Sequence, residues 1–263
     1  MKNVVASTLI ATSLMPCWLH ADEDNKEGWS FAVGAGIERE VEYHGSSEHE
    51  TEADVDIQAN YKSANGWEFS SNILHNQLRF PLSDRWTQAL WINYEDGRKE
   101  SDSSTGKLAG LGDIDSSIEL GAGVIYQATD RLELYLAGQT YTNDDVKKGS
   151  VGFLGADYAL IEGDRFSLNV NADISFADSE HLQTEFGVSD TQAASSVYSA
   201  YKISSGIKSY GVKIHSNYEL TPRWSLHAGV DYEVLAGDSA DSPLIQAGDD
   251  TEVEVSLGVS YHF

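Results

Sequence analysis

The chain has 263 residues, a formal net charge of −25 at pH 7 and a single cysteine. This acidity excludes a nucleic-acid binder, because few cationic side chains are present to neutralise phosphates. The only cysteine, Cys17, lies close to the N-terminus, so the rest of the chain forms no internal disulfide. No later segment offers the roughly 20 apolar residues of a spanning helix, so a membrane location would require strands.

The first 21 residues have the pattern of a secretory signal peptide. Lys2 supplies the positive charge, Val4 to Leu19 form a mostly apolar stretch, and Leu19-His20-Ala21 resembles a cleavage site. Pro16 stands before Cys17 where a lipoprotein signal requires a small residue. We therefore expect residues 1–21 to be a signal peptide and residues 22–263 to be a single exported domain.

Apolar and polar residues alternate with a period of two through most of the exported part. In Arg165–Phe176, for example, Phe166, Leu168 and Val170 share one face while Ser167, Asn169 and Asn171 share the other. Strands of about ten residues suit a tilted crossing of a bilayer. The alternation predicts strands near 28–38, 51–61, 66–74, 77–81, 86–95, 115–127, 131–141, 150–161, 165–176, 207–220, 224–235 and 251–263.

Short turns alternate with longer polar connections. Five turns are tight, at Asn65-Gly66, Ser83-Asp84-Arg85, Thr129-Asp130-Arg131, Gly163-Asp164-Arg165 and Thr221-Pro222-Arg223. Longer connections lie near 39–50, 96–114, 142–149, 177–206 and 236–250. This pattern is typical of outer-membrane barrels, whose turns are short on the periplasmic side and whose loops are long on the outer side.

The sequence therefore predicts an all-β fold, a transmembrane antiparallel up-and-down β-barrel of twelve strands. If the third and fourth strands fail, ten remain, because Asn72–Phe80 does not alternate cleanly. A soluble barrel or sandwich would enclose the apolar faces, whereas a membrane barrel turns them outward. Aromatic residues at the expected strand ends and the terminal Phe263 favour the membrane form, with both termini periplasmic. The aromatic positions are Trp29, Tyr43, Trp67, Trp86, Tyr126, Tyr218, Trp224 and Tyr261.

The polar strand faces would then enclose ionisable groups. These groups either pair across the lumen or line a narrow channel, which would prefer cations because the lining is mainly acidic. The candidates facing the lumen are Glu119, Glu133, Asp157, Asp173, Lys213, His215, His227, Asp231, Glu233 and His262.

Several segments, in order, resemble the MipA/OmpV family of outer-membrane proteins, the group of MltA-interacting proteins. The resemblance rests on Tyr43-His44-Gly45-Ser46, the stretch Gly110–Asp115, Gln183–Val188, Gln192-Ala193-Ala194, the run Tyr218–Trp224, the stretch Gly237–Pro243 and the end Tyr261-His262-Phe263. Its loop motifs include Gly110, Gly112, Asp113, Asp115, Asp238, Asp241 and Pro243. The segment Ser71–Phe80 looks less like the family.

The resemblance implies a non-enzymatic scaffold or docking protein with no cofactor. In the family, the founding member is regarded as linking a murein transglycosylase to a murein synthase, and other members are treated as antigens, adhesins or stress-responsive proteins. Expected partners are thus peptidoglycan-remodelling enzymes, outer-membrane lipid and lipopolysaccharide. The alternatives are a small cation-preferring channel, a lipid hydrolase and an adhesin.

Several other segments allow alternative interpretations. Asp113 and Asp115 in a glycine-rich stretch suggest a calcium loop, but the other ligands of such a loop are missing, and a plain turn explains the glycines. The connection 177–206 holds His181 and several acids and serines without a nucleophile motif. Gln192–Ser196 has helical composition and predicts a short helix over the barrel mouth. The acidic stretches Glu48–Asp56 and Asp238–Asp250 suggest solubility, or divalent ions shared with lipopolysaccharide.

Overall fold

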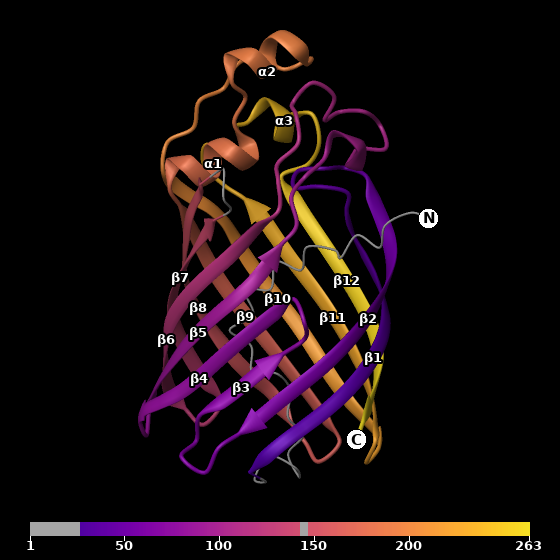
Figure 1. Cartoon of the computed structure of the whole chain (residues 1–263), viewed down its shortest axis with the longest axis vertical. Coiled ribbons are helices and arrows are strands. Elements are labelled where there is room, and N and C mark those ends of the chain that lie inside the picture. Colours follow the sequence, from indigo (N-terminus) through magenta and orange to yellow (C-terminus); the bar gives the residue numbers. More distant parts are fainter. Residues whose placement is uncertain (1–26, 143–146) are drawn as a thin grey trace.

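The computed structural model describes residues 27–142 and 147–263. The expected signal peptide lies outside this range, and the expected connection at 142–149 overlaps the undescribed residues 143–146. The described chain forms a closed barrel of twelve antiparallel strands (Figure 1). The strands are β1 (Gly28–Val41), β2 (His49–Lys62), β3 (Glu68–Ser71), β4 (His75–Ser83), β5 (Trp86–Glu95), β6 (Ser117–Thr129), β7 (Leu132–Thr142), β8 (Lys147–Glu162), β9 (Phe166–Ala177), β10 (Gly206–Thr221), β11 (Trp224–Leu235) and β12 (Thr251–His262).

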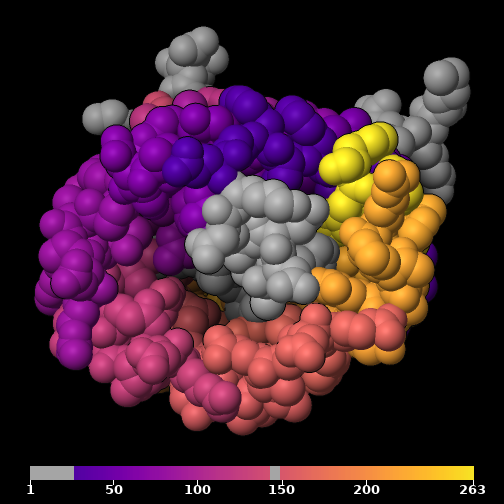
Figure 2. Space-filling model, turned by 90° about the horizontal axis from the view of Figure 1, so that it is seen from below, coloured from indigo at the N-terminus to yellow at the C-terminus, as the bar shows by residue number. Residues whose placement is uncertain are grey.

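Every strand pairs with its neighbours in the sequence, and β1 closes the ring against β12. At the closure Arg39 lies opposite Val255 and Ala32 opposite His262. Figure 2 shows the ring from below, with the colours following one another around it in chain order. The twelve-stranded, up-and-down topology that the alternation predicts is therefore confirmed.

The third and fourth strands exist, but with bounds that differ from those predicted. β3 has only four residues, while β4 has nine and contains Pro81 next to a register shift. Residues 72–74 join them in a tight hairpin whose central Ile73 has φ 77°. The hairpin ends far short of the loop end of the barrel. β2 therefore pairs with β1 over its full length but, in the described part of the chain, with β3 only from Ala59 to Lys62.

The outer surface of the barrel is apolar. Leu136 and Leu154, for example, are 59% and 53% exposed, while the preceding residues, Tyr135 and Phe153, are buried on the inner side. Such a surface is stable only against acyl chains, where every backbone group must be paired as it is in a closed ring. Within residues 27–142 and 147–263, no helix is long and apolar enough to cross a membrane.

The two ends of the barrel differ. The turn end carries the five tight connections and a girdle of aromatic rings in contact. The ring centroids of Trp86 and Tyr126 lie 4.8 Å apart in a tilted arrangement, and those of Trp224 and Tyr261 lie 5.1 Å apart edge to face. The loop end carries the long connections and the helices η1 (Glu100–Asp102), α1 (Ser179–Phe186), α2 (Asp190–Ser195) and α3 (Pro243–Gln246) (Figure 1). A short helix near Gln192–Ser196 was expected and is present as α2. Tyr43, which was expected in the aromatic girdle, is instead buried among the loops.

Candidate functional site

The long connections at the loop end fold together into a small domain-like structure, here called the loop cap. It comprises residues 42–48, 96–116, 178–205 and 236–250. Its centre is apolar because each connection contributes buried side chains, although each is polar overall. Phe186, Leu182, Leu108, Leu244 and Ile245 are at most 1% exposed.

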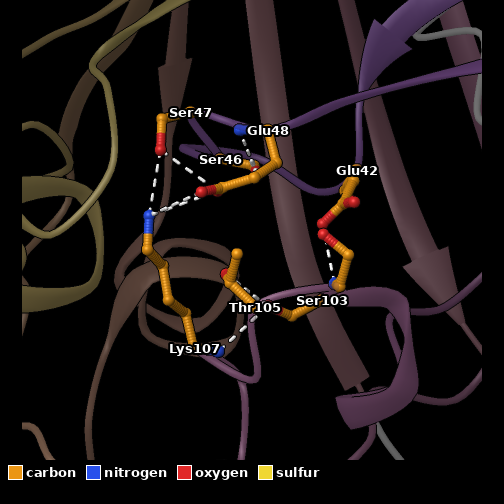
Figure 3. Close-up of polar contacts among 8 residues, drawn as sticks. Glu42, Ser46, Ser47, Glu48, Ser103, Thr105 and Lys107 are labelled. Atoms are coloured by element: carbon orange, nitrogen blue, oxygen red, sulfur yellow. Dashed lines mark hydrogen bonds and ion pairs between the residues drawn. The ribbon is translucent and has the colours of Figure 1, made fainter.

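Polar contacts tie the connections of the loop cap to one another. Lys107 Nζ donates to Ser47 Oγ at 2.9 Å and to Glu48 Oε2 at 3.2 Å, and the hydrogen bond to Glu48 lowers the pKa of that carboxyl (Figure 3). The Ser104 N–H donates to Glu42 at 2.8 Å. On the other side, Ser242 Oγ donates to the carbonyl of Phe186 at 2.6 Å. The cap is thus held by links between all of its connections and not by one element.

The loop motifs of the resemblance meet in this cap. Gly110 has φ 82°, and a Cβ there would lie 2.0 Å from the Ser195 carbonyl oxygen, so only glycine allows α2 to dock. Gly112 donates to Glu100, and Asp113 accepts from the Glu100 N–H at 2.9 Å. Asp115 is exposed.

The second group of motif residues shapes the connection 236–250. The Asp238 carbonyl accepts from Tyr201 Oη at 2.9 Å, and the Asp241 N–H donates to the Gly237 carbonyl. Pro243 begins α3, where its missing N–H leaves no partner unsatisfied. These residues build the cap, which explains why their pattern was visible in the sequence.

His44 joins the cap to the barrel wall. Its Nδ1 lies 2.8 Å from Glu252 Oε2, and the neighbouring Gly45 N–H donates to the other oxygen of that carboxylate at 2.9 Å. Burial disfavours the imidazolium, but attraction to Glu252 outweighs it and raises the pKa of His44 to about 9. At neutral pH this contact is therefore an ion pair.

Beneath the cap lies a cavity of about 470 Å³ in the upper lumen. Its lining includes fourteen carboxylate side chains but only three from lysine or arginine, namely Arg98, Lys208 and Lys213. Tyr43, Tyr141 and Phe153 add aromatic surface. All three cations are engaged. Lys208 Nζ lies 3.7 Å from Glu233, Lys213 Nζ lies 3.5 Å from Asp231, and Arg98 Nη1 donates to the Glu185 carbonyl at 2.8 Å. The cavity is thus an acidic compartment with aromatic walls.

Glu119 is the centre of a hydrogen-bond network on the inner face of β5, β6 and β7. Trp91 Nε1 and Asn93 Nδ2 donate to its Oε1 at 2.8 and 2.7 Å, and Gln139 Nε2 donates to its Oε2 at 2.8 Å. Trp91 turns inward because it lies opposite Gly121, which leaves room for the indole. Three donors on one carboxylate satisfy a buried charge without a salt bridge.

The other residues expected in the lumen fall into two groups. Asp173, Lys213, Asp231 and Glu233 line the acidic cavity together with Glu119. The remaining ones lie outside its lining and make local contacts: Glu133 with Arg79 at 3.5 Å, Asp157 with Asn171 at 2.9 Å, His215 with Asp231 at 2.7 Å, His227 with Ser260 at 2.6 Å and His262 with Ser225 at 3.1 Å.

Sequence reasoning missed several residues of this site, and four of them show why. Glu252 continues the inward alternation of β12, so it was accessible to the same argument as its neighbours. Lys208 lies within the register shift between Ile207 and Ser209, where alternation no longer assigns a face. Trp91 and Gln139 were missed because an aromatic and an uncharged side chain gave no sign of chemistry; the glycine opposite Trp91 was the only signal.

The alternative chemistries have local structural explanations. Within residues 27–142 and 147–263, no group of three or more His, Cys, Asp or Glu side chains is arranged to hold a metal ion. Asp178 caps α1 by accepting from the His181 N–H at 2.8 Å. The His181 imidazole is buried and stacks on Tyr141, with ring centroids 5.1 Å apart.

Comparison with solved structures gives distant barrel likenesses. The toluene transporter TodX of Pseudomonas putida shares 10% identity and a TM-score of 0.45, covering 90% of this chain and 89% of that one. The NanC porin shares 14% identity and a TM-score of 0.46, covering 88% and 98%. The translocator domain of the autotransporter NalP from Neisseria meningitidis shares 12% identity and a TM-score of 0.45, covering 91% and 90%.

Comparison with curated protein sequences gives no match. The family model described as MltA-interacting protein MipA, however, matches residues 33–263, which include all twelve strands apart from the first residues of β1, and the whole loop cap. With the apolar outer wall and the closed ring, this match identifies an outer-membrane β-barrel protein. The chain belongs to the MipA family.

Proposed function

We propose that this protein is a non-enzymatic outer-membrane barrel that docks a peptidoglycan-remodelling enzyme at its turn end, which faces the periplasm with both termini. The observation that carries the proposal is the loop cap. Its packed apolar core covers the loop end, which argues against a wide pore that opens at that end. The family description, an MltA-interacting protein, supplies the class of partner, a murein transglycosylase.

The turn end offers a partner exposed arginine side chains. Four of the five tight turns carry an exposed arginine, here called the arginine ring: Arg85, Arg131, Arg165 and Arg223. Arg223 donates to Tyr261 Oη at 3.1 Å, and the Arg165 guanidinium lies 5.3 Å from the Tyr218 ring centroid. Asp84, Asp130 and Asp164 directly precede three of these arginines, so the turns present charges of both signs. The guanidinium groups can contact carboxylates of a partner and, at the rim, lipid phosphates.

Site-specific photo-crosslinking in cells tests the docking role. A photoreactive residue at Asp130 or Pro222, in two of the turns, should capture a murein transglycosylase. The same residue at Val197, an 89% exposed position of the cap, should not. The double variant R131Q/R223Q should reduce capture, while K107Q at the loop end should not. Capture from Val197 alone, or none from any turn, would overturn the proposal.

A small cation-preferring channel is the second candidate, and the acidic cavity favours it. Planar-bilayer recordings separate the two. If the cap closes the barrel, the wild type should conduct little. The variant Phe186→Ala, which removes the centre of the cap core, should conduct with cation preference. Steady cation conductance of the wild type would favour the channel.

The exposed carboxylates of the loop end suggest a further contact, with lipopolysaccharide through shared divalent ions. This contact fits the proposed orientation, in which the loop end faces the outer leaflet.

A further inference from the structure

We propose that the acidic cavity beneath the loop cap binds a small organic cation that carries two or more protonated amines, such as a linear polyamine. This inference rests on the cavity and does not depend on docking at the turn end. The excess of carboxylates over cationic side chains in the lining gives the charge preference.

Two buried oxygen atoms in residues of the cavity wall lack a hydrogen-bond donor, which favours a ligand that carries N–H groups. Gln139 and Tyr43 both line the cavity, and they are 5% and 7% exposed. Gln139 Oε1 and Tyr43 Oη have no hydrogen-bond partner among the described residues. The Gln139 amide cannot simply be flipped, because its Nε2 donates to the Glu119 carboxylate at 2.8 Å. Leaving such an acceptor unsatisfied costs about 1–3 kcal/mol, which an ammonium or amine donor would recover.

The aromatic members of the lining fit the same ligand. Tyr43, Tyr141 and Phe153 present ring surface in a compartment that also holds carboxylates. Protonated amines are attracted to aromatic faces, and the methylene groups between amines cover apolar surface. A hydrated divalent metal ion would use the carboxylates but not the rings, so an amine chain satisfies more of the wall.

The low β3–β4 hairpin provides a route of entry through the wall. Above the hairpin, residues 49–58 of β2 have no pairing with β3, and His75 and Asn93 form the opposite side. Glu50 and Glu52 on β2, and His75 and Asn93 on β4 and β5, all line the cavity. The cavity therefore extends to this notch, while the loop cap closes it from above.

Isothermal titration calorimetry of the full-length folded protein in detergent micelles tests the proposal, with spermidine as the probe. Spermidine should bind saturably, and Mg²⁺ at the same ionic strength should compete poorly. The double variant E50Q/E52Q removes two carboxylates of the lining and should weaken spermidine binding about threefold or more. The control D130N/D164N removes the same charge at the turn end and should bind as the wild type does.

The outcomes decide the matter. Absence of saturable binding overturns the proposal, and so does equal weakening in both double variants, which would indicate attraction to net charge alone. Displacement of spermidine by equimolar Mg²⁺ would overturn the choice of an organic cation. Each variant is first checked for the heat-modifiable electrophoretic shift of a folded barrel. Q139L, which removes the unsatisfied amide oxygen, serves as a second binding test and should also weaken spermidine binding.

Discussion

Four inward glycines lie directly opposite a large or charged inward side chain on the neighbouring strand. In each pair, a Cβ on the glycine would come within 3 Å of the facing side chain, so the missing side chain is what makes room. The glycine therefore sets which large side chains the lumen accepts. The pairs are Gly121 with Trp91, Gly155 with Tyr135, Gly211 with Asp173 and Gly229 with His215.

Gly121→Val should destabilise the barrel. A Cβ at Gly121 would lie 1.8 Å from the Trp91 ring, so the indole must leave its place and the Glu119 network is disrupted. Overpacking of this kind costs about 1–3 kcal/mol. Urea unfolding in lipid vesicles, followed by tryptophan fluorescence, measures the change. Gly138→Ala is the control, since its Cβ meets only a backbone oxygen at 3.7 Å and should leave the midpoint unchanged.

The His44–Glu252 ion pair predicts a dependence of stability on pH. The pKa of His44 rises from 6.5 to about 9 on folding, so its contribution is complete below pH 6.5 and is lost as the pH rises toward 9. A hydrogen bond to a charged group contributes about 1.5–3 kcal/mol. The difference in unfolding free energy between wild type and H44N should therefore shrink from pH 6.5 to pH 9.5. A difference that stays constant would contradict this assignment.

At the scale of elements, alternation and turn chemistry predicted the number and order of the strands correctly. Both signals are local, and the closed ring follows from them because each strand must pair on both sides. The ends of β3 and β4 were not predictable, because Asn72–Phe80 lacks alternation and Ile73 adopts φ 77°, which its residue type disfavours.

The helices of the loop cap illustrate the same limit. α1 was missed although Asp178 is a sound N-cap, because its buried residues show no barrel periodicity. The apolar core of the cap joins residues more than a hundred positions apart, such as Leu108 and Leu244. Local sequence patterns do not predict such contacts. The acidic lumen was foreseeable from alternation, while its position under the cap was not.

Ile73→Gly should stabilise the protein slightly. A β-branched residue at positive φ stores about 1–3 kcal/mol of strain, and glycine relieves it at a small entropic disadvantage. Ile73 is 62% exposed, so little burial is lost. We expect a net gain of up to about 1 kcal/mol in urea unfolding, whereas I73V, which keeps the strain, should match the wild type. A loss of stability in I73G would show that the Ile73 side chain has contacts of greater value.

At the scale of the whole molecule, the buried apolar side chains of the loop cap and of the barrel interior form one cluster, but the two parts are held in different ways. The barrel is held by its hydrogen-bond ladder and by lipid, while the cap is held by a packed apolar centre in water. The cap should therefore unfold separately from the barrel, because disrupting the packed centre of the cap leaves the hydrogen-bond ladder of the barrel intact.

Phe186→Ala should open the cap and leave the barrel folded. Replacing the fully buried Phe186 with alanine costs about 3–5 kcal/mol of folding free energy. We expect this cost to exceed the stability of the small packed centre of the cap. Limited proteolysis should cut the variant within 178–205 and 236–250, while the electrophoretic shift of the folded barrel persists. V197A, at an exposed position, is the control. Loss of that shift in Phe186→Ala would mean that cap and barrel unfold as one unit.

The short β3 also gives the cylinder a seam. β2 shares fourteen register pairs with β1 but only four with β3, so the ladder resists separation unevenly on its two sides. Amide deuterium uptake should accordingly begin along residues 49–58 and then spread to the neighbouring strands. Thermal unfolding should start at the same place, between β2 and β3. A barrel whose β2–β3 pairing is short can open there toward the surrounding lipid while the hydrogen bonds between its other strands remain in place.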